Sequence, residues 1–108
     1  MIEFKKHKNS TAHLLIHWKA VDTLGIEVGD EVGFERDGED LYIYRLAPLG
    51  SRFGNGFKIT QSNTQNKGLV AYSNKVVSYA NPGDKFNLDD EYVFDELNEV
   101  ELYEMIKS

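Results

Sequence analysis

The chain has 108 residues, 41% hydrophobic and 28% charged, with a formal net charge of −6. This composition is typical of a single globular domain and excludes a fibrous or largely disordered chain. The absence of cysteine excludes disulfides, thiolate metal ligands and a cysteine nucleophile. No apolar run approaches the roughly 20 residues of a membrane helix, and the first residues lack the apolar core of a signal peptide, so we expect a cytoplasmic protein.

The first half of the chain predicts a strand, a short helix and a hairpin. In chain order, the expected elements are an extended start over 2–8, an apolar strand over 13–17, a short helix over 18–24, a turn over 26–30, and strands over 31–36 and 41–46. Gly25 predicts the end of the helix, because glycine adopts the left-handed conformation of helix C-caps. Asp37-Gly38 favours a tight hairpin turn between the two strands.

The second half predicts a similar series of elements. They are a connector over 47–56, a short strand over 57–60, a polar loop over 61–67, a strand over 68–72, a helix over 74–79, a turn over 81–84, and a hairpin of strands over 85–88 and 91–94. Ser73 is a candidate cap for the helix. Residues 96–106 fit either a helix or a strand, and we favour a strand near 100–103 with a frayed end.

Charge is distributed in four blocks along the sequence. Residues 1–19 and 41–83 are basic, and 41–83 contain no acidic residue; residues 20–40 and 84–108 are strongly acidic. The distribution therefore matters more than the net charge, because a basic block could meet phosphates while the acidic blocks point away. The alternating order of the blocks is also a first indication of an internal duplication.

The two halves of the sequence resemble each other. Gly29-Asp30 and Gly83-Asp84 are 54 positions apart, half the length of the chain. The same shift places Leu15-Ile16 on Leu69-Val70, Trp18 on Tyr72, Asn9 on Asn63, and Val32 and Phe34 on Phe86 and Leu88. We therefore predict a single domain over 1–108 that is mostly β. In it, half-barrel units 1–46 and 57–108, joined by the connector 47–56, close a small β-barrel around one core.

The segment from Leu14 to Phe34, with Thr23-Leu24-Gly25-Ile26 followed by Gly29-Asp30, resembles the AbrB/SpoVT-type swapped-hairpin transcription factors. Residues 4–46 cover one such unit, and residues 57–103 cover a second, more divergent one. Two units in one chain resemble the tandem MraZ-like arrangement, in which the barrel can close within the monomer. The resemblance implies a swapped-hairpin-like β-barrel of two pseudo-symmetric strand–helix–hairpin units, either as a monomer or as a homodimer.

The resemblance also implies a DNA-binding transcriptional regulator or an antitoxin-like protein, docking on double-stranded DNA through the basic segments of both repeats. The predicted DNA-binding residues are Lys5, Lys6, Lys8, Asn9, His13, Lys19, Lys58, Asn63 and Lys67. Members of the family often carry an arginine just before the apolar strand. This chain has His13 at that position in the first unit and Lys67 in the second. The chain departs from the family at Val21 and Asp22, in place of helix arginines, and at His17, in place of a proline.

No motif predicts catalysis, and we expect no enzyme, no catalytic residue, no cofactor and no metal site. His13 and His17 would share one face of a strand, but no third ligand is apparent, so they fit ordinary surface histidines better than metal ligands. Trp18 and Tyr72 occupy matching repeat positions, which favours packing residues over a platform for stacking bases.

The acidic residues between 89 and 104 are typical of a solvated face rather than of a catalytic pair of carboxylates. They also suggest an alternative function, an acidic protein–protein interaction module on the same barrel that does not bind DNA. In that case a protein partner would meet the acidic hairpin at Asp89, Asp90 and Glu91.

Overall fold

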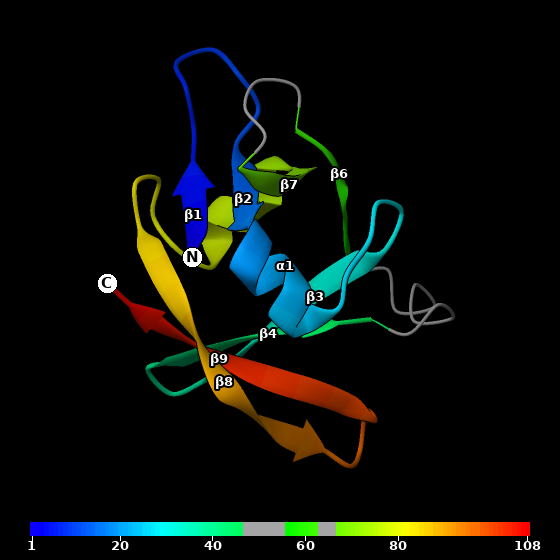
Figure 1. Ribbon diagram of the computed structural model, residues 1–108. Coiled ribbons are helices and arrows are strands. Elements are labelled where there is room, and N and C mark those ends of the chain that lie inside the picture. Colours follow the sequence, from blue (N-terminus) through cyan, green and yellow to red (C-terminus); the bar gives the residue numbers. More distant parts are fainter. Residues whose placement is uncertain (47–55, 63–66) are drawn as a thin grey trace.

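The computed structural model describes residues 1–46, 56–62 and 67–108 (Figure 1). The strands of these residues form one antiparallel sheet in the order β5-β3-β4-β9-β8-β1-β2-β7-β6. Their bounds are β1 Ile2–Lys5, β2 His13–His17, β3 Glu31–Asp37, β4 Asp40–Arg45, β5 Phe57–Lys58, β6 Thr60–Gln61, β7 Gly68–Tyr72, β8 Lys85–Asp95 and β9 Val100–Lys107. β5 and β6 lie at opposite ends of this order, yet only Ile59 separates them in sequence. The sheet therefore curls into a nearly closed barrel, and the prediction of a mostly β, barrel-like fold is confirmed.

The predicted elements of the first half are confirmed, with a shorter first strand. β1 covers Ile2–Lys5 and pairs with β2, so that Ile2 faces Ile16 and Lys5 faces His13. The helix α1 covers Trp18–Leu24 and ends at Gly25, whose φ of 67° is left-handed as expected for a C-cap. β3 and β4 form the predicted hairpin, and Gly38 takes a positive φ of 61° in its turn.

The predicted strand over 68–72 and the capped helix after it are also present. Ser73 lies at the N-cap, and its hydroxyl accepts a hydrogen bond from the backbone N–H of Lys75. The helix is a single 3₁₀ segment, η2, over Asn74–Ser78 rather than an α-helix. The predicted connector over 47–56 falls outside the described residues except for Gly56.

The predicted hairpin of strands over 85–88 and 91–94 is wrong. These residues form one strand, β8, which pairs with β9 as the true hairpin partner. Leu88 faces Met105 and Tyr92 faces Tyr103, so three residues of β8 lie opposite one residue of β9. Asp89–Glu91 thus form a β-bulge within a continuous strand, not a turn between two strands. β9 covers Val100–Lys107 and is longer than the strand expected near 100–103.

The interior of the barrel is a single apolar cluster that includes aromatic side chains of both halves. The ring of Phe4 lies 5.8 Å from that of Phe34 and 5.6 Å from that of Phe86. Phe34 in turn stacks on Tyr79 at 4.9 Å and contacts Phe57 at 5.6 Å. Such aromatic contacts add to the stabilisation from burial itself. Among the described residues, no helix combines the length and apolar character needed to cross a membrane.

Candidate nucleic-acid interface

The outer face of β1, β2 and β7 carries a row of polar side chains. Side chains alternate between the two faces of a strand, so Leu14 and Ile16 fill the core while His13 and His17 point outward. The strand register places Lys5 opposite His13 and His13 opposite Tyr72. Lys5, His13 and Tyr72 therefore lie side by side across three strands, and the His13 ring lies 5.4 Å from the Tyr72 ring.

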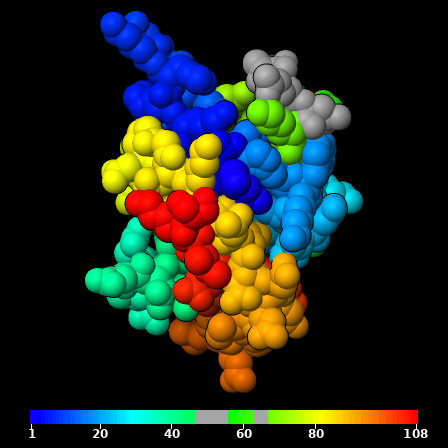
Figure 2. Space-filling model, turned by 60° about the vertical axis from the view of Figure 1, so that its left-hand side comes forward, coloured from blue at the N-terminus to red at the C-terminus, as the bar shows by residue number. Residues whose placement is uncertain are grey.

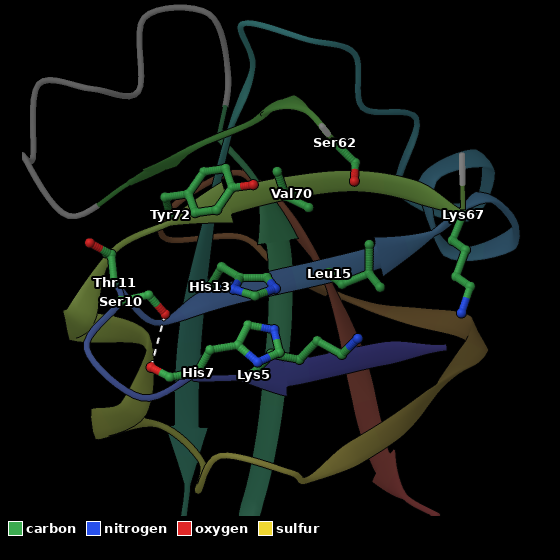
Figure 3. Close-up of a pocket in the computed structure, with 10 residues that line it drawn as sticks. All are labelled: Lys5, His7, Ser10, Thr11, His13, Leu15, Ser62, Lys67, Val70 and Tyr72. Carbon is green, nitrogen blue, oxygen red and sulfur yellow. Dashed lines mark hydrogen bonds between the residues drawn. The ribbon is translucent and has the colours of Figure 1, made fainter. Parts of the chain in front are cut away.

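This row borders a surface hollow of about 390 Å³, which we call the β2 hollow (Figure 3). Leu15 and Val70, which face each other across β2 and β7, form part of its lining. Its lysine and histidine side chains are Lys5, His7, His13 and Lys67. No carboxylate lines it in the described part of the chain. The hollow is therefore suited to an anionic ligand, with hydroxyl groups nearby on Ser10, Thr11 and Ser62.

His13 is held towards its neutral form. Partial burial lowers the pKa of its imidazole, and the neighbouring His7 and Lys5 lower it further, outweighing the opposing effects of a hydrogen bond to Thr11 and the charge of Glu3. The rings of His7 and His13 lie 5.8 Å apart. An anion in the β2 hollow would favour the protonated form of His13, because opposite charge stabilises the imidazolium.

A second hollow adjoins the first at Tyr72. This η2 hollow is lined by Lys58, Lys75 and Tyr72, together with residues of the η2 segment such as Ser78. No carboxylate lines it within the described ranges. Lysines from β5 and η2 therefore line a hollow that shares Tyr72 with the hollow lined by Lys5, His7, His13 and Lys67.

Tyr72 was missing from the predicted DNA-binding residues. Tyr72 was expected to be a packing residue; it packs beside the ring of His13, and 48% of its surface is exposed. Strand alternation could have placed Tyr72 on the outer face, since it follows the buried Ala71. Its position beside His13 depends on the register between β2 and β7, which local sequence does not show. Lys75 belongs to the basic block 41–83, but its place on η2 follows from the fold.

The other predicted DNA-binding residues lie on the loop between β1 and β2, on α1, or outside the described residues. Lys6 donates a hydrogen bond from Nζ to the carbonyl of Ser10 at 2.8 Å and so closes the loop between β1 and β2. Lys8 and Asn9 are exposed on that loop, and Asn9 has a positive φ of 64°. Lys19 lies on α1 and lines a separate small hollow. Asn63 lies outside the described residues.

Glu3 is a carboxylate on the outer face of β1, and its charge is paired. Its Oε2 lies 2.5 Å from Nε2 of His17, and its Oε1 lies 3.8 Å from Nζ of Lys85. Burial raises the pKa of Glu3, but the hydrogen bond to His17 and the charges of Lys5, His17 and Lys85 outweigh this and lower its pKa overall. His17 is therefore held by Glu3. Within the described ranges no cluster of three or more His, Asp or Glu side chains is arranged to hold a metal ion.

The acidic hairpin of β8 and β9 lies at the opposite end of the molecule from the loop between β1 and β2 (Figures 1 and 2). Asp90 and Glu91, from the bulge of β8, are exposed, and Asp89 is half-buried. Charge is therefore distributed unevenly over the molecule: cations lie around the β2 and η2 hollows, and carboxylates lie on the β8–β9 hairpin.

Comparison with known proteins gives no match for this chain: no family model fits it, and no curated protein or solved structure shows significant similarity to it.

Proposed function

We propose that this protein binds double-stranded DNA through one basic surface, which comprises Lys5, His7, His13 and Lys67 of the β2 hollow and Lys58 and Lys75 of the η2 hollow, with Tyr72 between them. The proposal rests on one observation: two hollows share Tyr72, their cations come from both halves of the chain, and no carboxylate of the described residues lines either of them. Lysines arranged in this way suit phosphate groups, which supply most of the affinity of a protein for DNA.

The proposal includes two pseudo-symmetric, swapped-hairpin units, as the sequence resemblance implies. Pairs of equivalent hydrogen bonds support it. The N–H of Gly29 donates to the carbonyl of Ile59 at 2.9 Å, and that of Gly83 donates to the carbonyl of Phe4 at 2.7 Å. Each Gly-Asp turn therefore binds the backbone of the other half, at Ile59 between β5 and β6 in one case and at Phe4 of β1 in the other. The two glycines also have matching φ values of 97° and 95°.

The central strands support the same symmetry. The N–H of Trp18 donates to the carbonyl of Lys67 at 3.1 Å, and the N–H of Ser73 donates to the carbonyl of Ala12 at 3.0 Å. Each donor is the residue directly after its own strand, and each acceptor is the residue directly before the strand paired with it. A pseudo-two-fold axis between β2 and β7 would relate their outer faces. Such a surface fits a DNA duplex, whose backbone has its own local two-fold symmetry.

The biological role that fits this reading is transcriptional regulation, as a repressor-like or antitoxin-like protein. In the proposed mechanism the lysines dock on phosphates and set the position of the protein on the duplex. The hydroxyl of Tyr72 and the polar side chains of Ser10, Thr11 and Ser62 are the candidates for contacts to sugars or base edges. The acidic hairpin points away from the duplex.

The test is a fluorescence-anisotropy titration against a labelled random-sequence duplex at low and near-physiological salt. We expect salt-sensitive binding, and we expect the variant K5Q/K67Q to bind more weakly with a log–log salt slope reduced by about 2, because each lost phosphate contact removes about 0.9. The matched control is K85Q/K107Q, which removes two lysines paired with Glu3 and Asp84. Equal salt slopes for the two variants would overturn the assignment of the surface.

A second candidate function is an acidic protein–protein interaction module on the same barrel that does not bind DNA. The observation that favours it is the projecting acidic hairpin, which carries exposed apolar side chains. The same titration separates the two candidates, because the absence of binding even at low salt would reject the DNA-binding proposal and leave the hairpin as the functional surface.

A further inference from the structure

The β8–β9 hairpin projects beyond the rest of the barrel. β1 pairs with β8 only at Lys85 and Phe86, and β4 pairs with β9 only over residues 103–105. In the described part of the chain, residues 92–95 of β8 therefore pair with β9 on one side and with no strand on the other. Figure 1 shows this end of the hairpin extending away from the rest of the sheet. A free strand edge presents unpaired N–H and carbonyl groups that another chain can bind.

Large apolar side chains are concentrated at this same end. Val93 is 59% exposed, Phe94 52% and Leu97 91%, and Tyr92 is also half exposed. A single exposed apolar residue needs no explanation, but four within six positions are a local concentration. Tyr92 and Phe94 lie on one face of β8 and Val93 on the other, so this apolar patch extends over both faces of the end of the hairpin. The patch is typical of a surface that another molecule covers.

The tip of the hairpin is ordered before any partner binds. Oδ1 of Asp95 accepts hydrogen bonds from the backbone N–H groups of Leu97 at 3.0 Å and Asn98 at 3.3 Å, and its Oδ2 accepts one from Nδ2 of Asn98 at 2.8 Å. These hydrogen bonds hold the backbone of the turn, from which the side chain of Leu97 projects with 91% of its surface exposed. Pre-ordering of this kind lowers the entropy cost of binding.

The charge of the hairpin decides the class of partner. Residues 84–108 contain nine acidic residues and two lysines, and those lysines pair with Glu3 and Asp84. In the described ranges no ion pair involves the carboxylates of Asp89, Asp90, Glu91, Glu96, Glu99 or Glu101. A second copy of this chain would bring two such hairpins together and oppose like charges, which is destabilising. A cationic partner gains from the same charges.

We propose that the β8–β9 hairpin binds an extended, basic and partly apolar segment of another protein, which adds as a strand along the free edge of β8 at residues 92–95. Main-chain hydrogen bonds of the added strand supply affinity, as in other cases of strand addition. Apolar side chains of the partner cover Phe94 and Leu97, and its lysines or arginines meet the hairpin carboxylates. This surface lies at the opposite end from the basic surface and does not depend on DNA binding.

The experiment uses the full chain, labelled with nitrogen-15, and a synthetic peptide of alternating lysine and valine. We expect millimolar or tighter binding, with the largest amide chemical-shift changes over residues 92–97 and slower amide exchange at residues 92–95. We also expect at least fivefold weaker binding of a peptide with a central proline, which removes a main-chain donor. A peptide of alternating glutamate and valine is expected not to bind.

Two variants identify the contacts. Leu97→Ser removes an exposed apolar side chain, and we expect it to weaken binding of the lysine–valine peptide at least fivefold. The control is Val28→Ser, which alters a 58% exposed residue on the turn before β3 and is expected to leave the affinity for the peptide unchanged. Equal affinity for the proline-containing peptide, or no change in L97S, would reduce the interaction to non-specific charge attraction and overturn the proposal. Self-association of the chain through the hairpin, measured by sedimentation, would assign the surface to a second copy and also overturn it.

Discussion

Glu3 and His17 face the same side of the sheet from neighbouring strands, with the carboxylate Oε2 2.5 Å from the imidazole Nε2. The side chain of Glu3 is only 11% exposed, and Lys85 of β8 approaches its other oxygen. Glu3 therefore links β1 to β2 and to β8, the strands on its two sides in the sheet. A charged group that is nearly buried depends on these partners, because an unpaired buried charge is costly.

We predict that Glu3→Gln lowers the free energy of unfolding by about 1.5–3 kcal/mol at pH 7, the range for a hydrogen bond to a charged group. The pKa of Glu3 is lowered in the folded protein. Its contribution is therefore fully present above the ordinary carboxyl pKa near 4.5 and is lost as the pH falls through the lower folded pKa. Urea unfolding of both proteins between pH 3 and 7 measures the difference.

The control for this prediction is Glu39→Gln, which neutralises an exposed carboxylate in the β3–β4 turn. We expect this variant to change stability by less than about 0.5 kcal/mol. A loss in the Glu3 variant that is as large at pH 3 as at pH 7 would contradict the role of the ionised carboxylate.

Gly68 begins β7 where the backbone of β2 comes closest. A Cβ atom at this position would lie 1.9 Å from the carbonyl oxygen of Ile16 and 2.8 Å from Cα of His17. We predict that Gly68→Ala costs about 3 kcal/mol or more, because rigid backbone must shift to relieve the overlap. Gly38→Ala is the matched control. Its φ of 61° is unfavourable for alanine but nothing crowds it, so about 1–2 kcal/mol is expected. Equal losses in denaturant unfolding would contradict the steric argument.

Much of the fold could be predicted from local sequence signals. The apolar runs of β2 and β7, the end of α1 at Gly25 and the turn at Gly38 all follow from periodicity or from the backbone preferences of glycine. β8 could not be predicted in this way. Asp89–Glu91 interrupt its alternation as a turn would, and only the pairing with β9 shows that they form a bulge in a continuous strand.

The candidate site could also be predicted only in part, because local sequence signals do not show how the elements pack together. The charge blocks and strand alternation identify Lys5, His13 and Lys67 as basic residues beside apolar strands, and the structure places all three around the β2 hollow. The adjacent η2 hollow depends on how a short 3₁₀ segment packs against β5, which no local pattern encodes. Lys19 points elsewhere because the direction of α1 is set by the core contacts of Ala20, Val21 and Leu24.

The titration of His13 predicts that DNA binding depends on pH. The pKa of free His13 is lowered by burial, His7 and Lys5, and a bound phosphate would raise it. Binding is then coupled to proton uptake, so affinity should increase as the pH falls from 8 to 6, by at most tenfold per pH unit for one proton. His13→Gln should flatten this dependence in anisotropy titrations at constant salt, and His17→Gln should not. An identical pH profile in H13Q would show that His13 takes no part in binding the phosphates.

Asp95 organises the hairpin tip through its carboxylate, which accepts hydrogen bonds from the backbone of Leu97 and from the backbone and side chain of Asn98. The hydrogen bond from the Asn98 side chain, with those from the backbone of Asn98 and Leu97, lowers the pKa of Asp95 despite an opposing effect of desolvation. Its ordering effect is therefore present above the ordinary pKa of 3.8 and is lost as the pH falls through the lower folded value.

We predict that Asp95→Ala speeds amide hydrogen exchange at Leu97 and Asn98 while leaving exchange in β2 and β7 unchanged, because the turn lies outside the barrel core. Glu96→Ala is the control, since it removes a carboxylate from the same turn but keeps Asp95. If Leu97 must be held outward for the hairpin to bind a basic segment, D95A should also weaken binding of the lysine–valine peptide more than E96A does. Equal weakening by the two variants would show that charge alone, and not the fixed position of Leu97, governs binding at the tip.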